Sequence, residues 1–133
     1  MSTSHNCDAV FVGCIDFRIQ SAMNDFVSSQ NLTGNCDRVS VAGSCKDTDF
    51  ILKQLEISHR LHHIKNVYLI HHQDCGAYGL PATTSPEEEK RLHQSDMESL
   101  RQKILATISP NLHVYLYFAH LDGSVVPLEN YGN

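Results

Sequence analysis

Four short segments with the character of β-strands, separated by stretches of helical periodicity, constrain the fold of this chain more than any other feature. The segments cover residues 9–13, 38–42, 67–71 and 114–118, and each has the length of a strand buried in a sheet. When strands and helices alternate along a chain, they usually form a parallel sheet with helices on both faces. We therefore expect an open, mainly parallel α/β fold.

Three stretches between these segments are predicted to be helical. Residues 19–29 are weakly amphipathic. The second helix begins at Asp47 or Thr48, either of which can cap it. The third begins with the capping sequence Ser85-Pro-Glu-Glu88 and ends before Pro110. The positions expected to follow the helical period of the second helix are Ile51, Leu55, Ser58, Leu61 and Ile64.

The end of the chain predicts a hairpin. Asp122-Gly123 is a tight-turn sequence, after which Val125-Val126 would return as an antiparallel strand at the edge of the sheet. Residues 76–84 are predicted to be a loop. A length of 133 residues suits one core, so we expect residues 1–133 to form a single domain.

Charge and composition argue against several partners. The net charge of −5 gives no general attraction to nucleic acid or to an anionic membrane. The beginning of the chain has no basic region, and no apolar stretch has the length of a membrane span. We expect a cytoplasmic protein. Its five cysteines, an odd number, favour metal binding or catalysis over a disulfide framework.

Two cysteines and a histidine stand at the ends of two predicted strands. Cys14 follows the first strand, while His72 and Cys75 follow the third. Each residue alone could be a buried thiol or a loop histidine. Ligands in open sheets bind beyond the carboxyl ends of the strands, however, so neighbouring strands would bring all three residues together. Two thiolates and an imidazole suit Zn²⁺ with an open fourth position.

His71 competes with His72 as the third ligand. Adjacent residues of a strand point to opposite faces, so only one of the two imidazoles is expected to reach the metal. The spacing to Cys75 favours His72, and His71 is expected to be a core group or to support a ligand. The other thiols, Cys7, Cys36 and Cys45, are expected to be structural or incidental. His59, His62 and His63 are expected on a solvated face near a helix end, and the remaining histidines are scattered.

Asp16 and Arg18 follow Cys14 closely and have three possible roles. They could form a surface ion pair, which contributes about 0–1 kcal/mol. Beside a metal, a carboxylate held by arginine could instead accept a hydrogen bond from metal-bound water and orient it. Asp16 could also act as a fourth ligand and close the site.

At these residues the chain resembles the beta class of carbonic anhydrases. The family signature is Cys-x-Asp-x-Arg after the first strand and His-x-x-Cys-Gly after the third. Both halves are present, as Cys14-Ile-Asp-Phe-Arg18 and His72-Gln-Asp-Cys75-Gly76. The resemblance extends over most of the chain from residue 8 onward. It implies strand order 2-1-3-4 with an antiparallel edge strand, and a homodimer or a multiple of dimers.

The resemblance also implies a reaction. Cys14, His72 and Cys75 would hold zinc, while Asp16 and Arg18 would form a catalytic dyad that keeps the fourth position open for water. The expected function is the reversible hydration of CO2 to bicarbonate by a zinc-bound hydroxide.

Some features depart from the family pattern. The first strand begins almost at once, where relatives usually carry a long N-terminal arm, and Phe17 replaces a customary small residue. Ser40-Val-Ala-Gly43 stands where Arg-Asn-Ala-Gly is usual. A more apolar mouth would suit a hydrolase of carbonyl sulfide or carbon disulfide. A weakly active or non-catalytic zinc-binding relative is a further alternative, whereas a redox role for Cys75 lacks a Cys-x-x-Cys pair.

Overall fold

The four predicted strands lie side by side in one sheet of the computed structural model, which describes residues 5–128. The spatial order is β2-β1-β3-β4-β5, with β1 to β4 parallel and β5 antiparallel to β4. The strands are β1 (Ala9–Gly13), β2 (Cys36–Ser40), β3 (Asn66–His72), β4 (His113–Ala119) and β5 (Val125–Pro127). The expected strand order and the antiparallel edge strand are confirmed.

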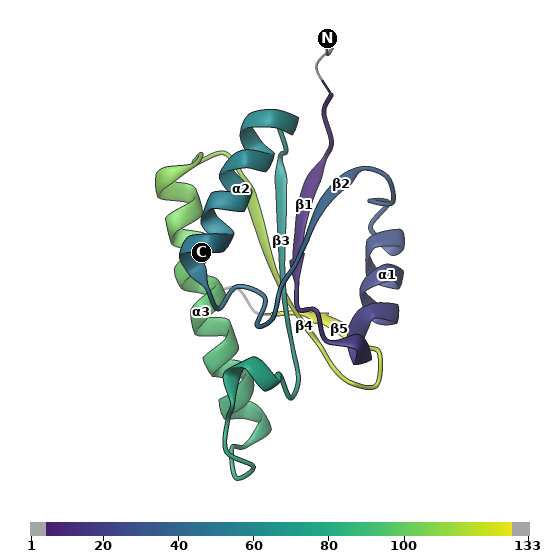
Figure 1. The fold of residues 1–133 in the computed structure, drawn as a ribbon, viewed down its shortest axis with the longest axis vertical. Helices are drawn as coiled ribbons and strands as arrows, with labels where there is room; N and C mark the ends of the chain where they lie inside the picture. Colours follow the sequence, from purple (N-terminus) through teal and green to yellow (C-terminus); the bar gives the residue numbers. More distant parts are fainter. Residues whose placement is uncertain (1–4, 129–133) are drawn as a thin grey trace.

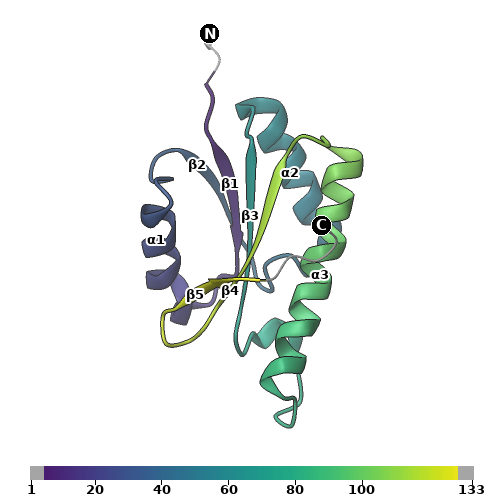
Figure 2. The same ribbon diagram turned by 180° about the vertical axis from the view of Figure 1, so that it is seen from behind.

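Helices cover both faces of this sheet, as expected. Helix α1 (Gln20–Ser29) lies on one face, whereas α2 (Thr48–His62) and α3 (Pro86–Thr107) lie together on the other (Figure 1). Figure 2 shows from behind that α1 stands alone on its side. Residues Phe17–Ile19 and Gly76–Tyr78 form short 3-10 turns after β1 and β3.

The alternation of side chains along β1 divides the core into two layers. Val10 and Val12 belong to the cluster beneath α2 and α3, while Ala9 and Phe11 belong to the cluster beneath α1. All five residues of β1 are buried. Because the central strand is covered on both faces, it is a continuous apolar run rather than an alternating one.

Several boundaries differ from the sequence-based expectation. Strand β2 covers Cys36–Ser40 rather than 38–42, because its ladder with β1 begins at Ala9↔Cys36 and the chain turns at Gly43, where φ is 82°. The predicted loop 76–84 begins with the 3-10 turn at Gly76–Tyr78. Two positions of the predicted helical period differ from the expectation. Leu61 is 47% exposed, and Ile64 is buried but lies beyond His62, the last residue of α2.

Among residues 5–128, no helix has both the length and the apolar character needed to cross a membrane. Residues 1–4 and 129–133 lie outside the described residues. The expectation of no leader sequence depends on the start of the chain and therefore falls partly on residues that the structure does not describe.

Helix α3 begins as predicted, with Ser85 as its cap. The Ser85 hydroxyl accepts a hydrogen bond from the Glu88 amide at 3.1 Å, and Pro86 occupies the first turn. We expect Ser85→Ala to lower the free energy of unfolding by about 1 kcal/mol, because an amide loses its partner. Thermal denaturation should show a drop of about 4 °C.

The matched control for this change is Ser95→Ala, at an exposed position within the same helix. There the substitution should leave the protein equally stable or slightly more stable, because alanine has the higher helix propensity. Equal melting temperatures for the two variants would contradict a stabilising cap at Ser85.

Candidate metal centre

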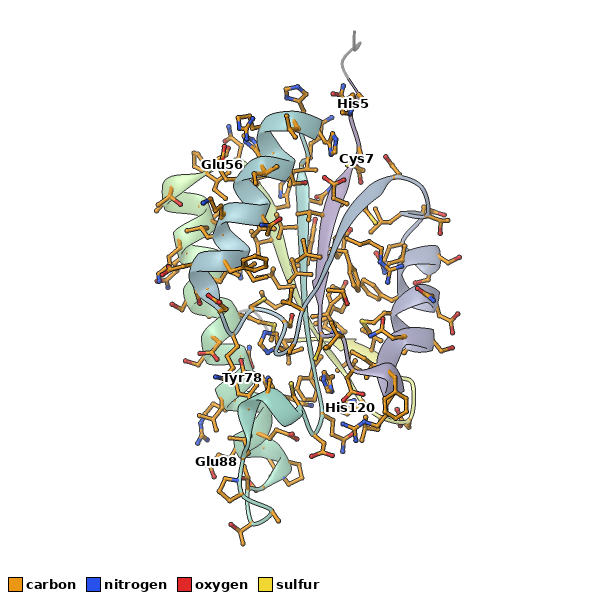
Figure 3. The ribbon with its side chains drawn as sticks, in the orientation of Figure 1. His5, Cys7, Glu56, Tyr78, Glu88 and His120 are labelled. Carbon is orange, nitrogen blue, oxygen red and sulfur yellow. The ribbon has the colours of Figure 1, made fainter. Side chains whose placement is uncertain are left out.

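Cys14, His72 and Cys75 converge at the carboxyl end of the sheet. Cys14 directly follows β1, and His72 is the last residue of the neighbouring parallel strand β3. Their ligand atoms and the Cys75 thiol all lie within 4.8 Å of one another. The three residues are buried, at 5%, 1% and 7% exposure respectively. In Figure 3 this end of the sheet is marked by Tyr78 and His120, which follow β3 and β4.

The spacing of the two thiols fits a shared tetrahedral cation. Cys14 Sγ and Cys75 Sγ are 4.0 Å apart. Two sulfurs bound tetrahedrally to zinc at about 2.3 Å would be about 3.8 Å apart. A disulfide requires about 2.05 Å, so the observed separation does not suit one.

The imidazole of His72 is also arranged like a ligand. Its Nδ1 lies 2.8 Å from the Gln73 carbonyl oxygen, which can only accept a hydrogen bond, so Nδ1 carries the proton. Nε2 then has a free lone pair. It is buried and has no hydrogen-bond partner in the described structure. Because an unpaired buried polar atom is costly, a cation at this point would satisfy it.

A cation beside the two buried thiols would make their deprotonation favourable. Burial, and to a smaller extent the neighbouring Cys14 thiol, raise the pKa of Cys75 to about 11, even though a hydrogen bond from the Ala77 amide lowers it. The Gly43 amide donates a hydrogen bond to Cys14 Sγ at 3.4 Å. A few such amides do not offset the cost of a buried thiolate. A metal ion would do so, because cation binding and thiol deprotonation are coupled.

The main chain of Gly43 approaches Cys14 because Gly43 has a left-handed backbone conformation, which glycine adopts readily. Its φ is 82°, and an added Cβ would lie 3.1 Å from the Lys46 Cβ and 3.2 Å from the Ala77 Cβ. The glycine therefore makes room for the amide that contacts the sulfur.

Asp16 and Arg18 form a rigid pair beside these residues. The guanidinium donates from Nη2 to Asp16 Oδ2 at 2.7 Å and from Nε to Oδ1 at 3.1 Å, and the Arg18 amide donates to Oδ1 at 2.9 Å. The side-chain hydrogen bonds from Arg18 are the main reason why the pKa of Asp16 is lowered to about 2. The carboxylate is therefore ionised at neutral pH and can only accept hydrogen bonds.

The position of Asp16 favours an orienting role over metal ligation. Its Oδ2 lies 3.8 Å from His72 Nε2, so the carboxylate faces the same space. Among the described residues, however, the ligand group at this place contains Cys14, His72 and Cys75 without Asp16. The tight contact with Arg18 holds the carboxylate back, which leaves room for a fourth, non-protein ligand.

Asp74 is a site residue that the sequence reading did not single out. Its carboxylate accepts a hydrogen bond from Arg18 Nη1 at 3.1 Å, and its carbonyl oxygen accepts one from Nη2 at 2.9 Å. Asp74 has a positive φ of 56°, and its amide donates to Glu89 at 2.6 Å. In the sequence, Asp74 was marked only by its position inside the His-x-x-Cys spacing. Its contact with Arg18 could not be predicted, because that contact depends on how two loops pack together.

His71 belongs to the core, as expected. Its Nε2 accepts a hydrogen bond from the Cys45 amide at 3.2 Å, so its Nδ1 carries the proton and donates to His93 Nδ1 at 2.7 Å. Burial lowers the pKa of His71 well below its ordinary value and that of His93 to about 4. Tyr78 contacts this neutral pair and donates to Asp96 at 2.6 Å.

His93 was regarded only as one of several scattered histidines, but it is fully buried. Its sequence signal was helical spacing. It precedes Met97 by four residues and Leu100 by seven, so all three lie on the buried face of α3.

The outer side of the centre opens into a pocket with an apolar rim. Cys14, Asp16, Arg18 and Ala77 are among the lining residues. Ile15 and Phe17 also line it, and they are 58% and 85% exposed. A small apolar molecule could approach the three ligand residues from this side.

The fold and the arrangement of the centre define an α/β protein of the beta-carbonic anhydrase type. A family described as "Putative carbonic anhydrase" matches residues 4–128. The chain therefore belongs to this "Putative carbonic anhydrase" family. An uncharacterized protein of Rickettsia conorii is 28% identical over 138 aligned positions, which cover 94% of this chain and 74% of the relative.

Solved structures share the fold at low sequence identity. A carbonic anhydrase of Streptococcus mutans matches with a TM-score of 0.69 and 18% identity, over 96% of this chain and 88% of that one. A tetrameric beta-carbonic anhydrase of Sordaria macrospora matches with a TM-score of 0.58 and 16% identity, over 95% and 82%. A carbon disulfide hydrolase matches with a TM-score of 0.56 and 14% identity, over 89% and 76%.

Proposed function

We propose that this protein catalyses the zinc-dependent reversible hydration of CO2 to bicarbonate. The main support is the buried group of Cys14, His72 and Cys75 with an ionised carboxylate, Asp16, facing the same space. Membership of the carbonic anhydrase family agrees with this chemistry. Cys14, His72 and Cys75 would hold Zn²⁺, since a set of two thiolates and one imidazole suits that ion.

Zinc, when bound, acts as a Lewis acid that lowers the pKa of water from 15.7 to about 7. The chain's own residues would then orient the reactants. Asp16 can only accept a hydrogen bond, so it would hold the nucleophile by its O–H and direct a lone pair toward the CO2 carbon. Arg18 would keep Asp16 ionised and in place, and Asp74 would in turn hold Arg18.

We further propose that residues 1–133 work as one zinc-binding domain in a cytoplasmic homodimer or a multiple of dimers. The exposed Ile15 and Phe17 beside the pocket provide apolar surface for a second subunit. The tetrameric relative of Sordaria macrospora supports a multimer. All five cysteines are free thiols, the state that a reducing cytoplasm maintains.

The apolar rim favours a second candidate reaction. Carbonyl sulfide and carbon disulfide are linear like CO2, but their sulfur atoms are larger and more weakly hydrated than oxygen, so a rim formed by Ile15 and Phe17 would suit them. The fold likeness to a carbon disulfide hydrolase agrees with this alternative. The same zinc ligands would serve either reaction.

A side-by-side kinetic assay of zinc-loaded protein tests both candidates. We expect stopped-flow measurements to show CO2 hydration with a larger kcat/KM than the hydrolysis of carbonyl sulfide or carbon disulfide. The reverse ranking would support the hydrolase. Absence of all three activities, in protein that holds stoichiometric zinc at the centre, would contradict a catalytic role and support a non-catalytic zinc-binding relative.

A further inference from the structure

A second group of metal-type side chains lies at the opposite end of the sheet. Cys7 precedes β1, Asp37 is the second residue of β2, and His62 is the last residue of α2. In Figure 3, Cys7 and His5 lie at the end of the molecule away from Tyr78 and His120. This group is therefore separate from the candidate metal centre at the carboxyl ends of the strands.

The three side chains are close enough to share one cation. Their ligand atoms all lie within 4.8 Å of one another. They are neither fully buried nor fully exposed, with side-chain exposures of 25% for His62 and 32% for Asp37. Thiolate, imidazole and carboxylate are the three kinds of protein ligand that zinc takes.

Main-chain contacts bring these residues together without a metal. The Cys7 amide donates to the His62 carbonyl oxygen at 3.1 Å, which holds residues 5–8, called here the N-terminal segment, against the end of α2. The Asp8 amide donates to the Asn35 carbonyl oxygen at 3.1 Å, beside the start of β2. A cation would thus meet ligands whose backbones are already in place.

The side chain of Asp37 is oriented in turn by a buried hydroxyl. Ser58, at 5% exposure, donates to Asp37 Oδ2 at 2.6 Å. The Ser58 contact is of the kind typical around metal ligands, whose rotamers it restricts. His62 Nδ1 lies 2.7 Å from the same oxygen, so these two proposed ligands share a proton that a bound cation would replace.

Electrostatics at this point also favours a cation. His62 ends α2, where the last carbonyl groups place the negative end of the helix dipole. Asp37 adds a carboxylate beside it. A shallow cavity lined by His5, Cys7, Asp37 and His62 opens to solvent, and the His5 ring lies 4.8 Å from the His62 ring, between centroids. A fourth ligand, either His5 or water, therefore has access.

We propose that Cys7, Asp37 and His62 form a second zinc-binding site that fastens the N-terminal segment to β2 and α2. The site is structural, because it lies at the amino ends of the strands and away from the proposed reaction. Because binding there requires the folded arrangement of three distant segments, zinc stabilises the folded protein.

Zinc titration of the metal-free full chain tests this proposal. Wild-type protein should bind two equivalents, and Cys7→Ser should bind one while retaining CO2 hydration. The double variant Cys14→Ser/Cys75→Ser should still bind one equivalent. With Co²⁺ it should show a thiolate charge-transfer band, and zinc should raise its melting temperature.

Adding Cys7→Ser to that double variant should weaken zinc binding by more than about 100-fold. This exceeds the loss expected when a residue only supports a ligand through a hydrogen bond. Asp37→Asn, which keeps the side-chain shape, should also weaken it. His59→Ala, on the same helix but outside the group, is the matched control and should have no effect. Should the double variant not fold, the stoichiometries of wild type and Cys7→Ser alone decide.

A single equivalent of zinc in both wild type and Cys7→Ser would overturn the second site, whatever the outcome of the hydration assay. Two equivalents in both would also overturn it, because the cation would then lie elsewhere.

Discussion

Replacing Cys14 or Cys75 with serine is expected to remove one equivalent of zinc and to reduce CO2 hydration to the uncatalysed rate. A serine hydroxyl does not form an anion at neutral pH, and the 4.0 Å pair of sulfurs is lost. Without the cation, nothing at the site lowers the pKa of water, which alone removes several orders of magnitude in rate. Elemental analysis and stopped-flow hydration assays measure the two effects.

The matched control is Cys36→Ser, which removes a half-buried thiol from β2 at the far end of the sheet. It should leave the hydration rate unchanged. If a Cys14→Ser or Cys75→Ser variant kept both its zinc at this centre and its activity, the proposed ligand set would be wrong.

Asp16→Asn is expected to keep zinc at the metal centre while lowering kcat/KM for hydration by about 100- to 1,000-fold. The amide has nearly the same shape, but it replaces an acceptor-only carboxylate with a group that also donates hydrogen bonds. It would no longer enforce one orientation of the nucleophile. Arg18 would remain tied to Asp74, so the loop should keep its position. Stopped-flow assays with parallel zinc analysis give both readouts.

Asp74→Asn provides the graded comparison for this change. Arg18 would lose a charged partner but keep the Asp74 carbonyl oxygen and the Asp16 carboxylate, so a much smaller loss of activity is expected. Loss of zinc from Asp16→Asn would point instead to a ligand role for Asp16. Full activity in Asp16→Asn would exclude the proposed dyad.

The sequence alone predicted much of the sheet and of the metal centre. Strands β1 and β3 are buried almost throughout and appear as continuous apolar runs, and β4 is also an apolar and aromatic run although its burial alternates, so all three could be recognised locally. Strand β2 was misplaced by two residues, because none of its residues is fully buried and its extent depends on pairing with β1. Ile64 was included in the helical period although α2 ends at His62, because spacing alone does not show where a helix ends.

The chemistry of the metal centre was readable because its residues have fixed spacings at strand ends. Cys14, His72 and Cys75 converge once two parallel strands are neighbours, which is a property of this fold class. The side chains that contact and orient these residues could not be predicted from the sequence. Asp74 reaches Arg18, and His93 pairs with His71, only through the packing of loops and of α3 against β3.

The sequence by itself determined the fold class, the order of elements and the residue types at the carboxyl ends of the strands, because these follow from local patterns of burial and spacing. Tertiary structure decided which side chains meet across segments. Cys7, Asp37 and His62 come together only when the residues before β1, the start of β2 and the end of α2 meet at one edge of the sheet. Contacts between residues far apart in sequence depend on three-dimensional packing, and no short-range pattern records them.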